Sequence, residues 1–145
     1  MAAPLARNKG GQIAKVYESR LEYGGGFKGE ETTLQRYAQI IRLRPEVEAE
    51  YIRYHAAVWP AVLATIADCG IRNYSIFLRD STLYAYFEYH GTDYAADMRK
   101  MAADPETQRW WKIMDPMQQP VETAAPGEHW SPLREVFHFD GPPVE

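Results

Sequence analysis

Two runs of β-branched and aromatic residues, 73–78 (NYSIFL) and 82–89 (TLYAYFEY), are separated only by the residues RDS. Such runs favour strands, and so short a connection joins two neighbouring strands into an antiparallel hairpin. Helical patterns flank this hairpin on both sides, and a strand pattern lies at each end of the region 36–140. The chain is therefore expected to fold around the hairpin in the order β-α-β-β-α-β.

The helical pattern before the hairpin runs from Pro45 to Cys69, with apolar positions every three or four residues and Gly70 as its end. This is the spacing of one buried helix face. Pro60 falls inside the pattern, where it removes a backbone donor and crowds the carbonyl of Ala56. We therefore expect a kink at Pro60, or a break into two helices.

Two further helices are expected after the hairpin, the first over residues 92–103. Asp104 and Pro105 are typical of the N-cap and first position of the next helix, which runs through ETQRWWKIM. Strand patterns at 36–43 and 133–139 complete an α+β, ferredoxin-like β-α-β-β-α-β order with an antiparallel sheet. Helices can cover only one face of such a sheet, although large side chains occupy both faces, so a partner subunit or a ligand cavity is expected to cover the other.

The chain of 145 residues has the size of one compact domain. Residues 1–35 are poor in large aliphatic side chains and contain GGGFKGEE, so they are predicted to form a flexible N-terminal extension. Residues 36–140 are predicted to form the folded domain, and residues 141–145 a C-terminal tail.

Composition narrows the classes of function. A net charge of -4 provides no basic surface of the kind that nucleic acid or an anionic membrane requires. Cys69 is the single cysteine, so neither an intrachain disulfide nor a thiolate zinc site is expected, and a reducing cytoplasm suits the chain. No apolar run is long enough for a signal peptide or a membrane span.

Several motifs of covalent and nucleotide chemistry are missing from the sequence. It contains no glycine-rich phosphate loop, no Gly-x-Ser-x-Gly elbow and no HExxH. His90, His129 and His138 show no spacing that suits a metal ion, so no metal site is expected. These absences disfavour covalent catalysis and nucleotide chemistry and leave proton transfer or plain binding.

His55 lies in the stretch YIRYHAAVWP, on the apolar helix stripe and one turn after Tyr51. An imidazole has an unperturbed pKa of about 6.5 and can therefore accept and release a proton near neutrality. Two interpretations stay open: a proton-transfer residue, or a core histidine bonded to a backbone carbonyl. Tyr51 likewise is either a plain core tyrosine or a phenol that binds a hydroxyl or orients the imidazole.

The adjacent residues Trp110 and Trp111 point about 100° apart on a helix, so both cannot face one core stripe. One of them is expected to bridge to a dimer interface or to stack on the apolar face of a sugar. Tyr74 opens the second predicted strand, where its hydroxyl reaches either a pocket or solvent.

The segments YIRYHAAVWP, GIRNYSIFL, LYAYFEY, ADPETQRWWKIMDPM and LREVFHF, in this order and spacing, resemble the L-rhamnose mutarotase family over about residues 37–140. This resemblance implies a dimeric, ferredoxin-like α/β barrel that interconverts the α and β anomers of L-rhamnopyranose without a cofactor. It also implies a proton donor, His55, and four sugar-binding residues, Tyr51, Tyr74, Trp110 and Trp111.

Anomer exchange requires only that protons move while the sugar ring opens and closes, which a histidine can catalyse. The complementary proton acceptor is left open between Tyr51, a carboxylate such as Glu88, and an ordered water. One rival hypothesis is a cofactor-free monooxygenase or another enzyme on the dimeric α/β-barrel fold, since a fold says little about a reaction. The other is a sugar-binding or purely structural dimer without enzymatic activity.

Overall fold

A computed structural model describes residues 34–144 of the chain, so the predicted extension lies outside the described residues except for its last two positions. The strands are β1 (Gln35–Leu43), β2 (Ile71–Arg79), β3 (Thr82–Tyr89), β4 (Gln118–Gln119) and β5 (Ser131–Leu133). The helices are α1 (Glu48–His55), α2 (Pro60–Asp68), α3 (Tyr94–Ala103) and α4 (Pro105–Met114), with short 3-10 helices at Pro45–Val47 and Asp115–Met117. No helix in this range is long and apolar enough to cross a membrane.

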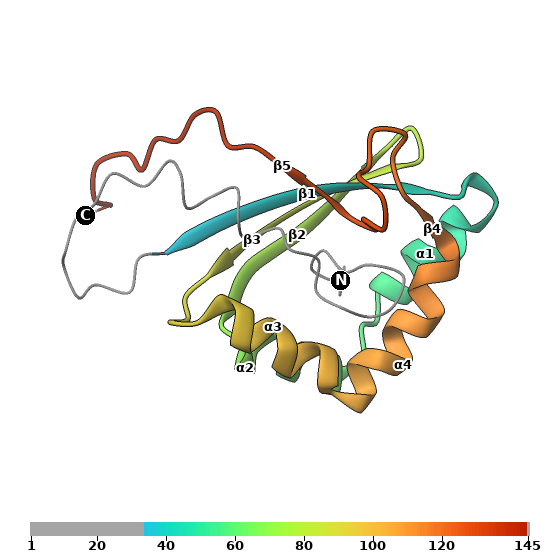
Figure 1. Ribbon diagram of the computed structural model, residues 1–145, viewed down its shortest axis with the longest axis horizontal. Helices are drawn as coiled ribbons and strands as arrows, with labels where there is room; N and C mark the ends of the chain where they lie inside the picture. The colour runs from blue at the N-terminus through green and yellow to red at the C-terminus, as the bar shows by residue number, and fades with distance from the viewer. Residues whose placement is uncertain (1–33, 145) are drawn as a thin grey trace.

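The strands form one antiparallel sheet in the order β2-β3-β1-β4, and β5 also pairs with β1. All four α-helices lie below the sheet in the view of Figure 1, which leaves its upper face without helices. The arrangement confirms the predicted ferredoxin-like, α+β fold, with each predicted helical region divided into two helices.

The break predicted at Pro60 is confirmed. Helix α1 ends at His55 and α2 begins at Pro60, a residue that suits the first helical position because it needs no N–H partner there. The carbonyl of Trp59 accepts from the backbone N–H of Val62, at 3.0 Å, and so starts the new helix. The break leaves His55 at the last position of α1.

The hairpin and the helix caps follow from local sequence. Asp80 and Ser81 have φ of 50° and 54°, the two left-handed residues of a tight turn that suits the twist of paired strands. Asp93 and Asp104 cap α3 and α4, accepting from the backbone N–H groups of Ala96 at 3.0 Å and Thr107 at 2.8 Å. The predicted start of α4 is therefore confirmed.

The predicted last strand, 133–139, was wrong in its bounds. Strand β5 covers Ser131–Leu133, and residues 134–140 have no strand assignment. Leu133 pairs with Ala38, and the ion pair of Arg36 with Glu135, at 3.0 Å, continues that register without the backbone ladder. The strand pattern beyond Leu133 therefore has no partner strand within the described chain, and its apolar side chains Val136, Phe137 and Phe139 are exposed.

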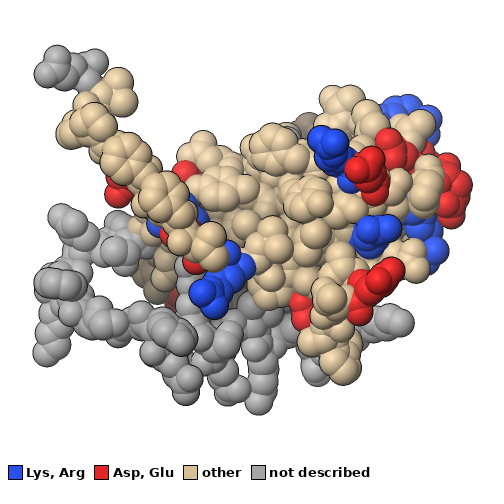
Figure 2. Space-filling view, turned by 90° about the horizontal axis from the view of Figure 1, so that it is seen from above, with Lys and Arg blue, Asp and Glu red and all other residues tan. Residues whose placement is uncertain are grey.

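The two faces of the sheet differ in what covers them. The helix-facing side chains, among them Ile41, Leu83 and Phe87, belong to the buried core. On the outer face Tyr84 pairs with Phe77 of β2, and these side chains are 41% and 63% exposed. Figure 2 shows this face as a broad uncharged surface with charged side chains near its margins. The prediction that helices cover one face and leave large side chains on the other is confirmed.

Candidate active site

His55 is half-buried at the end of α1, and its two ring nitrogens have different environments. Nδ1 lies 2.8 Å from the carbonyl oxygen of Tyr51, which can only accept, so Nδ1 carries a hydrogen and donates it. Nε2 is buried and has no hydrogen-bond partner among residues 34–144. In the neutral ring the lone pair of Nε2 is therefore free to take a proton.

Burial lowers the pKa of His55 below its ordinary value of 6.5, and the hydrogen bond to the Tyr51 carbonyl opposes this effect only in part. The imidazole is therefore mostly neutral at pH 7. The carbonyl bond also matches the expected alternative, a histidine of the core. The unpartnered Nε2 distinguishes the site from that alternative, because a satisfied core histidine would use both nitrogens.

Tyr51 is buried beside His55, with ring centroids 4.1 Å apart and planes inclined by 25°. Its hydroxyl oxygen lies 3.4 Å from Nε2 of Gln118, which donates to it. Burial raises the pKa of Tyr51, and the hydrogen bond from Gln118 opposes this only in part. Tyr51 is therefore a neutral phenol at physiological pH and a poor candidate for the complementary proton acceptor.

Trp110 is fully buried and makes a T-shaped contact with the His55 ring, with centroids 5.5 Å apart. Trp59 meets the same indole edge-on at 5.1 Å, from the break between α1 and α2. The Nε1 atom of Trp110 is buried with no hydrogen-bond partner in the described range. A buried donor without a partner is costly, so this N–H is suited to a hydroxyl of a bound ligand.

The other two predicted binding residues lie further along the same side of the sheet and helices. Trp111 belongs to the buried core together with Trp110, because α4 packs against both α2 and α3. Both indoles are thus buried within this chain, although the sequence predicted that they could not both face one core stripe. Tyr74 packs on Phe87, with ring centroids 5.4 Å apart.

Sequence reasoning missed two polar residues that connect to the hydroxyl of Tyr51, namely Gln118 directly and His129 through Gln118. Gln118 of β4 is buried, and its Oε1 lies 3.0 Å from Nε2 of His129. Pairing of Leu43 with Gln118 brings β4 beside β1 and so places this amide at the Tyr51 hydroxyl. No local pattern in the sequence signals such a contact. Within residues 34–144 no three His, Cys, Asp or Glu side chains are grouped so that they could hold a metal ion.

Glu88, the carboxylate considered as an acceptor, lies away from this cluster. It accepts from the side-chain amide of Asn73 at 2.6 Å and from the hydroxyl of Tyr86 at 3.4 Å. Along β3 it alternates with the buried residues Phe87 and Tyr89, so it faces the outer side of the sheet. Its position does not support a role beside His55.

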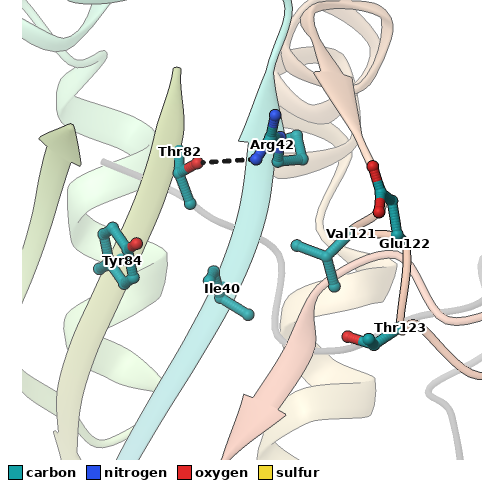
Figure 3. A pocket seen from close by; sticks show the side chains of 7 residues that line it. All are labelled: Ile40, Arg42, Thr82, Tyr84, Val121, Glu122 and Thr123. Atoms are coloured by element: carbon teal, nitrogen blue, oxygen red, sulfur yellow. Dashed lines mark hydrogen bonds between the residues drawn. The ribbon is translucent and has the colours of Figure 1, made fainter. Parts of the chain in front are cut away.

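A shallow hollow of about 240 Å³ opens on the outer face of the sheet (Figure 3). Arg42, which forms part of its wall, donates to the hydroxyl of Thr82 at 3.4 Å. None of the predicted site residues lines it, and Ile40 and Tyr84 point into it from the face opposite His55. The candidate active site is therefore the cluster around His55, not this hollow. The residues that line the outer hollow are Ile40, Arg42, Thr82, Tyr84, Val121, Glu122 and Thr123.

Comparison with known proteins gives a consistent result. The sequence profile of the L-rhamnose mutarotase family matches residues 36–139. L-rhamnose mutarotase of Opitutus terrae is 36% identical over 107 residues, which are 72% of this chain and 98% of the relative. L-rhamnose mutarotase of Bacillus subtilis is 33% identical over 109 residues, which are 74% of this chain and all of the relative.

Solved structures agree with this result. L-rhamnose mutarotase of Formosa agariphila is 25% identical, covers 73% of this chain and 99% of its own, and has a TM-score of 0.58. A NIPSNAP family protein of Agrobacterium tumefaciens, 17% identical, has a TM-score of 0.52 over 79% of this chain and 97% of its own, which shows the shared fold alone. From the profile match and these identities, the chain belongs to the L-rhamnose mutarotase family.

Proposed function

We propose that this protein interconverts the α and β anomers of L-rhamnopyranose by proton transfer, without a cofactor. The observation that carries the proposal is the buried, unpartnered Nε2 of His55 in a chain of the L-rhamnose mutarotase family. A lowered pKa keeps this nitrogen unprotonated near neutrality, where it can act as a base.

Ring opening moves one proton, in net, from the anomeric hydroxyl oxygen O1 to the ring oxygen O5. Nε2 of His55 takes the proton from O1, the O1–H electron pair forms the carbonyl, and the C1–O5 bond breaks. The imidazolium then donates the proton to O5. After rotation about C1–C2, the same steps in reverse close the ring on the other face of the carbonyl. One histidine can serve as acceptor and donor in turn, because its neutral imidazole takes the proton from O1 and the imidazolium that forms returns it to O5.

Tyr51, Tyr74, Trp110 and Trp111 are the proposed sugar-binding residues. Tyr51 and Trp110 contact the His55 ring directly. Each has a neutral O–H or N–H group that can donate a hydrogen bond to a sugar hydroxyl. An apolar aromatic wall also suits the C6 methyl group of a 6-deoxy sugar and excludes water from the reacting atoms. Tyr74 and Trp111 extend that wall in this proposal.

The protein is further proposed to act as a homodimer in the cytoplasm. The uncharged outer face of the sheet, with Tyr84 and Phe77 exposed, supports a second copy as its cover. Two copies that meet face to face would bury the same surface of each, as an isologous interface requires. The lone Cys69 is a free, buried thiol, which suits a reducing compartment.

Saturation-transfer NMR on the anomeric protons tests the proposed reaction. With L-rhamnose in excess, irradiation of the α signal should reduce the β signal in proportion to enzyme concentration. Parallel spectra of L-fucose and other aldoses measure the preference among sugars. If the protein binds aldoses but transfers no saturation between the α and β signals of any of them, it is a sugar-binding module and not a mutarotase.

A further inference from the structure

The side-chain amide of Gln118 lies between two groups that come from distant parts of the chain. Its Nε2 faces the hydroxyl of Tyr51 on α1, and its Oε1 faces the ring of His129 in the segment before β5. Gln118 is only 3% exposed, so both contacts are shielded from bulk water. A buried amide with partners on both ends can hold only one orientation.

His129 determines that orientation. Its Nε2 lies 3.0 Å from Oε1 of Gln118 and 3.6 Å from Oδ1 of Asp115. The Asp115 carboxylate can only accept, so the Nε2 that faces it carries a hydrogen in the inferred arrangement. If the Gln118 amide were flipped, its NH2 group would face the N–H of His129. Neither of these two donors would then have an acceptor in the other, and the NH2 group would no longer donate to Tyr51. The NH2 group of Gln118 therefore faces Tyr51.

The orientation has a consequence for Tyr51. Its hydroxyl oxygen accepts from Gln118, so its own hydrogen must be directed elsewhere. The Tyr51 ring stacks on His55, whose Nε2 is buried without a partner in the described chain. A ligand that reaches Nε2 would thus meet a phenol whose lone pair is already occupied and whose hydrogen is available.

We propose that Gln118, held by His129, is a positioning residue that keeps the Tyr51 hydroxyl as a hydrogen-bond donor to the sugar. Gln118 and His129 do not touch the substrate; they act through Tyr51. The inference rests on the proposed mutarotase function and adds two residues to its site. It also gives the site a polarity, in which Tyr51 donates to a sugar oxygen while Nε2 of His55 accepts a proton.

A double-mutant cycle between Gln118→Met and Tyr51→Phe tests this role. Methionine retains the length of the side chain but cannot donate to Tyr51, so kcat/KM for anomer exchange should fall about 3- to 10-fold, the usual worth of one hydrogen bond. In the Tyr51→Phe protein the same Gln118 substitution should change kcat/KM less than about 2-fold, because the group through which it acts is gone. Gln119→Met, at the exposed neighbouring position on β4, is the matched control and should leave kcat/KM unchanged.

Three outcomes separate the possibilities. The positioning role would be overturned if Gln118→Met lowered kcat/KM equally in the wild type and in the Tyr51→Phe protein. It would also be overturned if Gln118→Met lowered only the melting temperature. If Gln118→Met does not fold, His129→Leu takes its place in the cycle, since it releases the same amide from the other side. A wild-type protein that catalyses no anomer exchange would instead refute the proposed function, and the positioning role with it.

Discussion

At the scale of single residues, His55 carries the proposed reaction. His55→Asn retains approximate size and hydrogen-bonding capacity but removes titration near neutrality. We expect the exchange rate to fall about 100-fold or more, the contribution typical of general acid–base catalysis, with little change in melting temperature. His90→Asn, at an exposed histidine, is the matched control and should retain the wild-type rate.

Retention of more than about a tenth of the rate by folded His55→Asn protein would contradict the catalytic role, because a general acid–base contribution of this size could not be so nearly dispensable. The opposite pattern, a large loss of stability with an unchanged rate per folded molecule, would identify His55 as a histidine of the core.

The direction of the His55 pKa shift predicts the pH dependence of the rate. Burial lowers the pKa below 6.5, so the neutral, proton-accepting imidazole persists into mildly acidic solution. The rate of anomer exchange should therefore stay level down to pH 6.5 and fall only below it. A rate profile whose acid limb lies above pH 6.5 would contradict the environment described for His55.

The same shift links His55 to stability. The unfolded chain binds a proton to this histidine at a higher pH than the folded chain does. The contribution of His55 to the free energy of unfolding is thus present above pH 6.5 and is lost as the pH falls through the lowered folded-state pKa. Unfolding titrations of the wild type and of His55→Asn at several pH values separate this contribution from those of other groups.

At the scale of elements, α4 depends on its N-cap. The carboxylate of Asp104 accepts from both the backbone N–H and the hydroxyl of Thr107, each at 2.8 Å. Asp104→Ala should lower the free energy of unfolding by about 1 kcal/mol, and it should leave the exchange rate per folded molecule close to wild type. Chemical denaturation measures the loss, and Asp68→Ala, at an exposed position, is the control. An unchanged midpoint would show that packing of Trp110 and Trp111, not the cap, sets the start of α4.

At the scale of the whole molecule, the outer sheet face is the proposed dimer interface. A stable isologous interface should bury more than about 1,200 Å² in total, and sedimentation at micromolar concentration should show a dimer. Tyr84→Glu should shift the equilibrium to monomer, because it would bury a charge in that face. Leu63→Glu changes a residue of similar exposure, 39% against 41%, on the helical side and should remain dimeric. A monomeric wild-type protein would contradict the proposal.

The whole-molecule scale also includes the N-terminal extension. Strand β1 begins at Gln35, and the match to the family profile begins at residue 36. A truncated protein that starts near Thr33 should therefore fold and retain its exchange rate. If the truncated protein folds but loses most of its activity, the extension contributes to the site.

The order of elements, the break at Pro60 and the caps of the helices were predictable from the sequence, because each depends on neighbours a few residues apart. His55 could likewise be placed on an inward helix stripe by periodicity alone. The resemblance of the surrounding residues to a family motif added the expected chemistry, which spacing does not contain, and the profile match over residues 36–139 shows the family.

Tertiary structure decided what depends on distant parts of the chain meeting. Both indoles at 110 and 111 are buried because helices on two sides cover α4, which a single-stripe argument does not consider. The strand pattern at 133–139 is local, but a strand also needs a partner, and pairing with β1 ends at Leu133. Gln118 and Tyr51 are 67 positions apart, and they meet only because β4 pairs with the end of β1. Periodicity indicates which side of an element faces inward, whereas the group that it meets there is set by the packing of the whole chain.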